Sequence, residues 1–381
     1  MSKSRLQSVY SGVKYFITDQ WFLLALAILV AISSQAQVPA SSQKLKETVV
    51  TYLCPAVIFF ITGCTLATRI LWENYTRWKI HLFTQIQCFL MCSASAYGVV
   101  SLCATNSDFM DPALLIGLIF LGCVPTTIAS NTIMTKQAHG NHVLTLVEST
   151  VGNLIGPALS PALINMYILP RPWYTDFLPL AQVDNYAELY KRVFQQFGLS
   201  LFLPLAIGQV VQNLFPQVTN KIFVEWRLSK LGSLALLILI WQTLSHQTFD
   251  QAFETGAFTS VKGNNMVFIV LMSLAFYLLW LAISILLSLP WLAREEIVTV
   301  AYVVPAKTPA LGIPLSAVMF AGLDRVTQSK IQVPLVIYQG LQIACGSVFT
   351  LVLRRWIEIG RAAKAGKDVE EASQDRASSD G

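Results

Sequence analysis

The segment that decides the fold is Gly122–Asn131, which reads GCVPTTIASN. It interrupts an apolar stretch that begins at Leu114 and resumes in patches after Asn131. Pro125 lacks a backbone N–H and clashes with the preceding helical turn, so a regular helix cannot continue through this segment. In hydrocarbon, a broken backbone is tolerated only where protein buries it or where it lines a water-filled cavity. The segment therefore predicts either a proline-kinked helix or a broken helix that builds a binding site, as in many secondary transporters.

Four hydroxyl or amide side chains follow Pro125 within the same segment. In a kinked helix, such hydroxyls bond to the carbonyl oxygens of their own helix. In a broken helix, they face a cavity and bind a solute or an ion. The four residues are Thr126, Thr127, Ser130 and Asn131.

The composition is that of a membrane protein. Of the 381 residues, 54% are hydrophobic and 12% are charged, whereas soluble domains carry about 25% charged residues. The long apolar runs predict an all-α polytopic protein whose partner is the lipid bilayer. The basic residues are dispersed among loops, so we expect no nucleic-acid binding. The seven cysteines lie in or beside apolar runs without a CxxC pair, and we interpret them as packing residues rather than metal ligands.

Hydropathy predicts ten membrane spans. Their boundaries are 17–34, 48–68, 80–104, 112–136, 142–168, 195–215, 229–247, 265–290, 296–320 and 331–355. Residues 361–381 are rich in Ala, Ser, Asp and Glu, and we predict a disordered cytoplasmic tail there. If both termini are cytoplasmic, the cytoplasmic segments hold roughly twice as many lysines and arginines as the outer segments, as the positive-inside rule requires.

Two charged residues lie well inside predicted spans. A charge at the bilayer centre is costly, and it is usually paired or in contact with water. Glu148 is in the fifth span. An alternative to a functional role is that it lies near the inner interface, where its side chain reaches water. Lys307 is in the ninth span between Pro305 and Pro309, and this density of prolines predicts a second broken helix.

The two breaks correspond in position. They fall in the fourth and ninth of ten spans, so each is the fourth span of its half. Because five spans is an odd number, the second half is inverted relative to the first. The pattern predicts two inverted five-helix repeats whose broken helices cross at the membrane midplane.

The fifth span adds polar groups to the candidate site. Thr145, Glu148 and Ser149 have the spacing of one helical face. The second break contributes Pro305, Lys307, Thr308 and Pro309. The nearby His139 and His142 lack a third ligand, so we predict no metal site from them.

These residues resemble the bile acid/sodium symporter family, solute carrier family 10. The matching segments are Pro125–Asn131 followed by Gly140 and Asn141, Thr145–Thr150, and Ala306–Pro314. More narrowly, they resemble its divergent SBF-like branch, around the seventh member and the fungal calcium-homeostasis regulators. The resemblance implies one transporter domain over residues 1–360. In it, a panel of spans one, two, six and seven moves against a core of spans three to five and eight to ten.

The resemblance also implies ion sites. In sodium-coupled members, Ser and Asn of the fourth span bind one Na⁺ together with hydroxyls of the fifth span. The matching candidate Na⁺ ligands here are Ser130, Asn131, Thr145 and Ser149. Those members carry Glu and Gln on the ninth span at the positions of Val303 and Lys307, so an ammonium stands where a second Na⁺ would sit. In having a lysine at this position, the sequence resembles the divergent branch. A lysine can stand in for a bound cation.

The resemblance further implies a restraint on cellular calcium entry. We expect a secondary transporter that binds or moves a small solute or ion at the crossed helices. Helix N-termini would attract an anionic group, and Lys307 would add its charge or pair with Glu148. The alternatives are a non-transporting regulator that binds a calcium-entry channel or lipid, and a sodium-coupled organic anion symporter. The chain lacks HExxH, GxGD and GxSG motifs, so no enzyme is expected. The plasma membrane is favoured over the Golgi and the endoplasmic reticulum.

Overall fold

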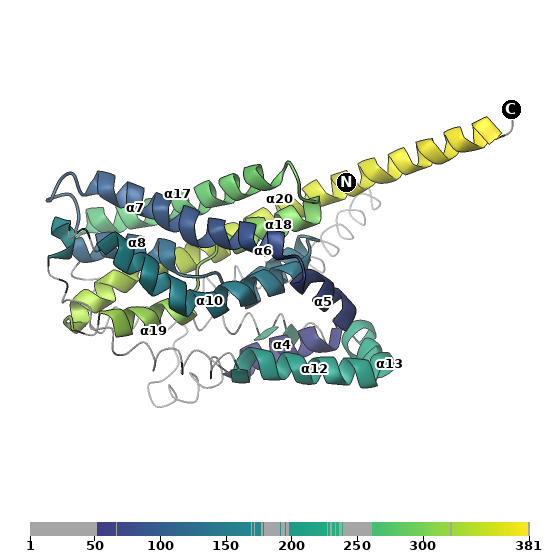
Figure 1. Ribbon diagram of the computed structural model, residues 1–381, viewed down its shortest axis with the longest axis horizontal. Helices are drawn as coiled ribbons and strands as arrows, with labels where there is room; N and C mark the ends of the chain where they lie inside the picture. Colours follow the sequence, from purple (N-terminus) through teal and green to yellow (C-terminus); the bar gives the residue numbers. More distant parts are fainter. Residues whose placement is uncertain are drawn as a thin grey trace, which may run out of the picture. The chain divides into compact units, whose positions relative to one another are not determined.

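The computed structural model describes residues 52–65, 67–168, 198–226, 261–320 and 322–379, with short pieces between 170 and 178 and scattered residues between 191 and 238. All regular structure in these residues is helical (Figure 1), so the all-α class is confirmed for the described part of the chain. The predicted span at 17–34 and most of the span at 229–247 lie outside the described residues.

The chain divides into two compact units. The first comprises Met1–Ala67 and Phe194–Glu254, and the second comprises Thr68–Val193 and Thr255–Gly381. Each unit is described separately below.

In the first unit, α4 packs closely along α12. The contact depends on glycine, because a Cβ atom on Gly208 would lie 2.5 Å from the carbonyl oxygen of Phe60. The Gln209 side chain spans the same contact, and its Nε2 donates to the carbonyl oxygen of Gly63 at 2.8 Å. The described elements of this unit are α4 (Cys54–Thr65), η6 (Gly198–Phe202), α12 (Leu203–Leu214), α13 (Pro216–Thr219) and η7 (Asn220–Glu225).

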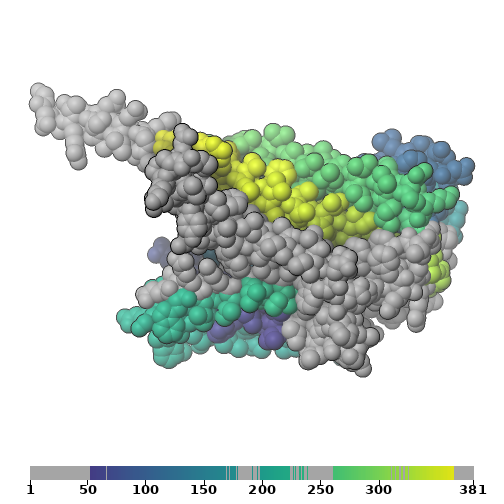
Figure 2. Space-filling model, turned by 180° about the vertical axis from the view of Figure 1, so that it is seen from behind, coloured from purple at the N-terminus to yellow at the C-terminus, as the bar shows by residue number. Residues whose placement is uncertain are grey.

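The second unit contains the two predicted breaks. Its elements are α5 (Thr68–Tyr75), α6 (Trp78–Gln85), η3 (Ile86–Met91), α7 (Cys92–Cys103), α8 (Pro112–Cys123), α9 (Ala129–Gln137), α10 (His142–Ile168), η4 (Trp173–Thr175), α17 (Gly263–Ser288), α18 (Arg294–Val303), α19 (Pro309–Met319) and α20 (Arg325–Ser379). Helices α17 and α20 pack together and are seen on one face of this unit (Figure 2).

Four helices in the described residues are long and apolar enough to cross a membrane, and the count rises to six if each bent helix pair is one span. The four overlap the predicted third, fifth, eighth and tenth spans. They are Trp78–Cys103, His142–Ile168, Gly263–Ser288 and Val326–Ala363.

Helix α8 lies at the centre of the second unit. It packs against α7 on one side and α20 on another (Figure 1). Every residue from Ala113 to Cys123 is buried, as expected for a helix that is apolar all round. This central position fixes the C-terminal end of α8, where the first break begins.

Helix α20 continues to Ser379 and extends beyond the other helices of its unit (Figure 1). The disordered tail expected from residue 361 stays a prediction, but the sequence also favours a helix there. The physical reason is local composition. Residues 361–379 contain many Ala, Glu, Lys and Arg residues, which have high helix propensity, and no proline. A low apolar content therefore does not exclude a continued helix here.

The N-terminus of α8 is fixed by Asp111. Its Oδ1 accepts a hydrogen bond from the Ala113 N–H at 3.0 Å, and its Oδ2 lies 2.8 Å from Nζ of Lys330 on α20. Replacing a capping aspartate with alanine removes the acceptor of an otherwise unpaired helix N–H. We expect Asp111→Ala to lower the free energy of unfolding by about 1–2 kcal/mol.

Thermal unfolding of the purified protein in detergent measures this effect. The matched control is Asp108→Ala, because Asp108 is an exposed residue of the same loop. Equal melting temperatures for the two variants would show that Asp111 does not stabilise α8.

Candidate functional site: the crossing of two broken helices

The first break separates α8 from α9. Helix α8 ends at Cys123, and Val124 is extended, with φ −75° and ψ 144°. Regular helix resumes only at Ala129. The proline therefore accompanies a broken helix rather than a kinked one, and the five intervening residues leave backbone groups that need partners from elsewhere.

The second break separates α18 from α19. Helix α18 ends at Val303, and α19 begins at Pro309 after Thr308, which is extended with φ −101° and ψ 119°. Side chains from other helices bond to the exposed carbonyls. Tyr338 donates its hydroxyl proton to the carbonyl oxygen of Pro305 at 2.5 Å. The Pro305 carbonyl oxygen in the second break thus has a hydrogen-bond donor inside the protein, as a membrane interior requires.

The two breaks are in direct contact. The N–H of Thr308 donates to the carbonyl oxygen of Pro125 at 2.8 Å. Gln342 of α20 holds the second break at the adjacent residue, because its side chain accepts from the Lys307 N–H at 2.7 Å and donates to the Lys307 carbonyl at 2.8 Å. These bonds make the crossing a single hydrogen-bonded unit.

The Lys307 side chain fills the core of the crossing. It is fully buried, and its Nζ lies 2.7 Å from the carbonyl oxygen of Cys88, 3.1 Å from that of Val124 and 3.3 Å from that of Gly122. The ammonium also lies 5.4 Å from the ring centroid of Trp280. An ammonium has three N–H donors, and three carbonyl oxygens surround this one. Two of them belong to the C-terminal end of α8, where the helix dipole is negative.

Lys307 and Glu148 are not paired with each other. Glu148 Oε1 lies 2.8 Å from Nδ1 of His81, and its Oε2 accepts from Nε2 of Gln85 at 3.1 Å. Of the two roles expected for Lys307, the ion pair with Glu148 is therefore not formed in this structure. The physical reason is that each charged group already has other partners. Backbone carbonyl oxygens accept from the Lys307 ammonium, and the side chains of His81 and Gln85 on α6 contact the Glu148 carboxylate.

The polar side chains after Pro125 form a compact network. Asn131 Nδ2 donates to Thr126 Oγ1 at 2.7 Å and to the Thr127 carbonyl at 2.8 Å. Thr127 Oγ1 donates back to Asn131 Oδ1 at 2.8 Å, and Ser130 Oγ donates to Thr127 Oγ1 at 2.7 Å. The hydroxyls of Thr127 and Ser130 thus bond to neighbouring side chains rather than to carbonyl oxygens of their own helix, so the kinked-helix alternative does not describe them. Asn131 is the centre of this network.

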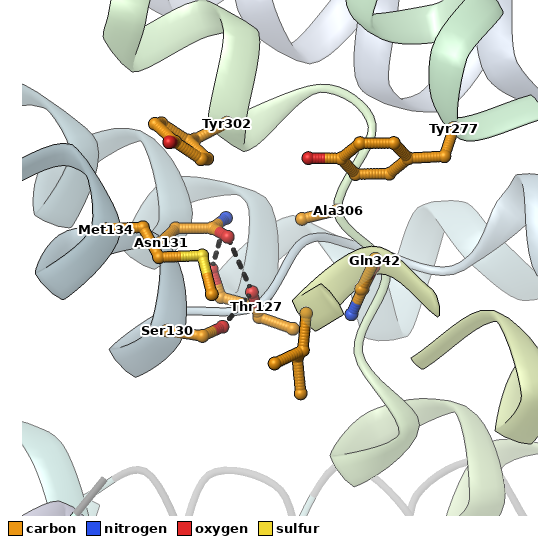
Figure 3. Close-up of a pocket in the computed structure, with 9 residues that line it drawn as sticks. Thr127, Ser130, Asn131, Met134, Tyr277, Tyr302, Ala306 and Gln342 are labelled. Carbon is orange, nitrogen blue, oxygen red and sulfur yellow. Dashed lines mark hydrogen bonds between the residues drawn. The ribbon is translucent and has the colours of Figure 1, made fainter. Parts of the chain in front are cut away.

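A small cavity lies beside this network (Figure 3). Its volume is about 10 Å³, which is near the lower limit for one water molecule. In this conformation the cavity accepts a water or an unhydrated ion, and an organic solute does not fit. The lining residues are Thr127, Ser130, Asn131, Met134, Tyr277, Tyr302, Ala306, Gln342 and Ile343.

The four candidate Na⁺ ligands do not share one network. Thr145 Oγ1 lies 3.0 Å from Thr135 Oγ1 and 3.1 Å from Thr299 Oγ1. The Ser149 hydroxyl is buried without a partner, whereas Ser130 and Asn131 are joined through Thr127. Helical spacing placed the α10 residues on one face, but it could not tell which neighbour each hydroxyl meets. The four residues thus share no common hydrogen-bond network, and the Na⁺ site stays a prediction.

No group of three or more His, Cys, Asp or Glu residues in the described part of the chain could hold a metal. Helix α10 instead supports the crossing through a side-chain amide. Asn153 Nδ2 donates to the Thr126 carbonyl and to the Ser149 carbonyl, each at 2.8 Å. This amide ties α10 directly to the first break.

Most predicted site residues meet at the crossing. They are Pro125, Thr126, Thr127, Ser130, Asn131, Pro305, Lys307, Thr308 and Pro309. Sequence reasoning missed the partners His81, Gln85 and Gln342. A signal existed for Gln342, because it is a side-chain amide within the apolar run predicted as the tenth span.

Comparison with known proteins identifies the family. The model of the SBF-like CPA transporter family matches residues 20–355. This chain belongs to that family. It is 34% identical to the protein named solute carrier RCH1 of Candida albicans over 382 residues, which cover 91% of each chain. It is 32% identical to solute carrier RCH1 of Saccharomyces cerevisiae, covering 91% of this chain and 86% of that one.

A vertebrate relative is more distant. Sodium/bile acid cotransporter 7 of Mus musculus is 26% identical over 343 residues, covering 89% of this chain and 93% of that one. The resemblance to the SBF-like branch is therefore confirmed. The chain is an integral membrane protein of a transporter family, and its relatives are solute carriers rather than enzymes.

Proposed function

We propose that this protein is a secondary-transporter-like membrane protein that restrains cellular calcium entry by binding or moving a small solute or ion at the crossed broken helices. The observation that carries this proposal is the hydrogen bond from Thr308 N–H to the Pro125 carbonyl, beside a cavity lined by polar side chains. Restraint of calcium entry is what the resemblance to the SBF-like branch implies. Both termini are cytoplasmic in this proposal, and the plasma membrane is its location.

The proposed architecture has ten spans in two inverted five-helix repeats. Two observations support it. Each break separates two helices of about ten residues, α8 from α9 and α18 from α19, so the two breaks are built alike. The two compact units also have the residue ranges of the proposed panel and core. In this architecture, movement of the panel relative to the core opens the crossing to one side of the membrane at a time.

The geometry favours a small ion or solute over an organic anion. The cavity is about the size of one water, and the Lys307 ammonium is already held by three carbonyl oxygens. It is therefore not available to bind a carboxylate or sulfonate. A sodium-coupled organic anion symporter is therefore less well supported, because neither the cavity volume nor Lys307 suits an organic anion.

A non-transporting regulator is the second candidate. The observation that favours it is the same lysine, because a buried ammonium held by three carbonyl oxygens beside a cavity of about 10 Å³ suits a structural element as well as a transport site. In that case the protein would bind a calcium-entry channel or lipid through other surfaces, and the crossing would not take part.

Replacement of Asn131 separates the two candidates. Asn131→Ala removes the side chain that bonds both Thr126 and Thr127, and leaves buried polar groups without partners. We expect cells that lack the protein to show raised calcium entry, read with a cytosolic calcium reporter. Wild type should restore the restraint, and Asn131→Ala at matched abundance should restore little of it.

The control is Asn106→Ala, the same substitution in an exposed turn where Asn106 accepts from the Asp108 N–H. This variant should behave as wild type. Full restoration by Asn131→Ala would reject the crossing as the working part and favour the non-transporting regulator.

A further inference from the structure

A buried histidine and glutamate join α6 to α10. His81 Nδ1 lies 2.8 Å from Glu148 Oε1, and the two side chains are 13% and 0% exposed. The second ring nitrogen, Nε2, lies 3.2 Å from the carbonyl oxygen of Tyr75 at the end of α5. Gln85 completes the environment of the carboxylate by donating from Nε2 to Oε2. The pair lies outside the crossing, and the function proposed above does not use it.

The two ring-nitrogen contacts of His81 can both be hydrogen bonds only if the His81–Glu148 pair holds a proton. The Tyr75 carbonyl can only accept, so Nε2 carries a hydrogen. The contact between Nδ1 and the carboxyl group also needs one hydrogen, on the nitrogen or on the oxygen. Both bonds are made only by an imidazolium with a carboxylate, or by an imidazole with a carboxylic acid. These two forms contain the same number of protons.

Release of that proton must break a contact. A neutral imidazole has one N–H, which can serve Glu148 or the Tyr75 carbonyl but not both. Loss of the proton to water therefore frees His81 from α10 or from the end of α5. The partly exposed His81 edge gives the proton a route to water, while Glu148 stays fully buried. The geometry thus couples proton binding to the contact between these helices.

No other charged group of the described residues forms an ion pair with His81 or Glu148. Glu296 of α18 pairs with Arg77, and Glu295 of α18 pairs with Arg361. Lys307 of the second break is held by carbonyls, and Lys136 of α9 has an exposed side chain. On α5, Arg69 pairs with Glu73. The remaining titratable groups on the packed elements are Tyr75 on α5, Lys79 on α6, Cys88 on η3, Cys123 on α8, His142 and Tyr167 on α10, and Arg294 and Tyr302 on α18.

Helix α10 links the pair to the crossing. It carries Glu148, and one turn later Asn153, which donates to the carbonyl oxygen of Thr126 in the first break. Two buried oxygens near Glu148 have no protein partner, Gln85 Oε1 and Ser149 Oγ, and such groups in native proteins are commonly bonded to water. A shift of α10 against α6 would therefore move a residue that holds the first break.

We propose that His81 and Glu148 bind a shared proton, and that this proton is the coupling ion of the crossing. The proton-binding part stands on the geometry of the pair alone. The coupling part deepens the proposed function and rests on it. His81 is thus assigned as the group that exchanges the proton with water, and Glu148 as the buried group that retains it.

Nuclear magnetic resonance of the full-length protein tests the shared proton. The protein has four histidines, so ¹⁵N-histidine labelling in lipid nanodiscs gives four ring signals that single substitutions assign. The His81 ring signal should follow a different pH dependence in Glu148→Gln than in wild type, because the carboxyl group that shares its proton is gone. His142→Gln is the control, since His142 has the same chemistry but no carboxylate partner among the described residues, and it should leave the pH dependence of the His81 signal unchanged.

Unchanged His142 and His139 signals in Glu148→Gln show that the variant is folded. If it does not purify folded, Glu148→Asp replaces it, because the shorter carboxylate withdraws from His81 and the same change is expected. A His81 signal whose pH dependence is identical in wild type and in the folded Glu148 variant would overturn the proton site. Coupling is tested separately with the calcium reporter at several cytosolic pH values, where Glu148→Gln should lose the pH dependence of wild type.

The two failures are distinguishable. A persistent pH dependence in Glu148→Gln would overturn the coupling. Full activity of Asn131→Ala, with a His81 signal whose pH dependence changes in the Glu148 variant, would reject the proposed function and leave the proton site in place.

Discussion

Lys307→Met is expected to remove most of the calcium restraint and to lower the free energy of unfolding by about 3–5 kcal/mol, as when one partner of a buried charged contact is lost. Methionine has nearly the length of lysine, so packing is largely kept. The carbonyl oxygens of Cys88, Gly122 and Val124 lose their shared donor. Each such buried acceptor costs about 1–3 kcal/mol when it is left unpaired.

Thermal unfolding in detergent measures the loss. Lys262→Met is the matched control, because the Lys262 side chain is exposed, and it should unfold at the wild-type temperature. A further arm uses Lys307→Ala, which shortens the side chain and leaves space inside the carbonyl cage. Methylammonium should raise the melting temperature of this variant and not that of wild type. Wild-type stability of Lys307→Met would contradict the role of the ammonium at the crossing.

Gly117→Ala is expected to have the second large effect. A Cβ atom at Gly117 would lie 2.5 Å from the carbonyl oxygen of Ile331 and 2.9 Å from the ring of Pro334, both on α20. Backbone and a rigid ring cannot rotate away, so α8 and α20 must separate. Overpacking of this kind costs about 1–3 kcal/mol and sometimes more. Because the C-terminal end of α8 supplies two of the carbonyls around Lys307, we also expect reduced calcium restraint.

The same substitution at Gly98 gives the control. Nothing lies within 4 Å of a Cβ atom at Gly98 in the middle of α7, and alanine has the higher helix propensity. Gly98→Ala should therefore stabilise the protein by about 0.5–1 kcal/mol. The opposite signs of the two changes are the result to check by thermal unfolding. A neutral Gly117→Ala would show that the α8–α20 contact is less close than described.

Sequence reasoning located both breaks because proline acts locally. Pro125 and the prolines around Lys307 each remove a backbone N–H donor from a helix, and the structure has a break at each place. Proline alone does not decide this, because Pro157 and Pro161 lie inside the continuous helix α10. The fifth span was also placed well, since α10 runs from His142 to Ile168 and the predicted span is 142–168. Hydropathy predicts the bounds of this helix because the apolar residues and the polar residues at both ends are consecutive in the sequence.

The partners of the buried charges could not be predicted in the same way. His81 and Glu148 come from different helices. Lys307 and the carbonyl oxygen of Cys88 likewise come from segments far apart in the sequence. Helical periodicity shows which residues share a face, but it does not show which neighbouring helix that face meets. The same limit applies to Thr145, because its spacing on α10 did not show that its hydroxyl meets Thr299 of α18. A sequence also does not reveal that carbonyl oxygens, which every residue carries, are the partners of a lysine.

Thiol labelling of Ser130→Cys is the most direct test of transport at the crossing. Ser130 lines the cavity and is 8% exposed. The variant is placed in sealed right-side-out and inside-out vesicles and treated with a membrane-impermeant methanethiosulfonate reagent, and mass spectrometry of the peptide that contains residue 130 reads the modification. Asn106→Cys in the exposed turn is the control, and it should be labelled from one side only. Alternating access predicts labelling of residue 130 from both sides, whereas labelling from a single side or from neither would contradict it.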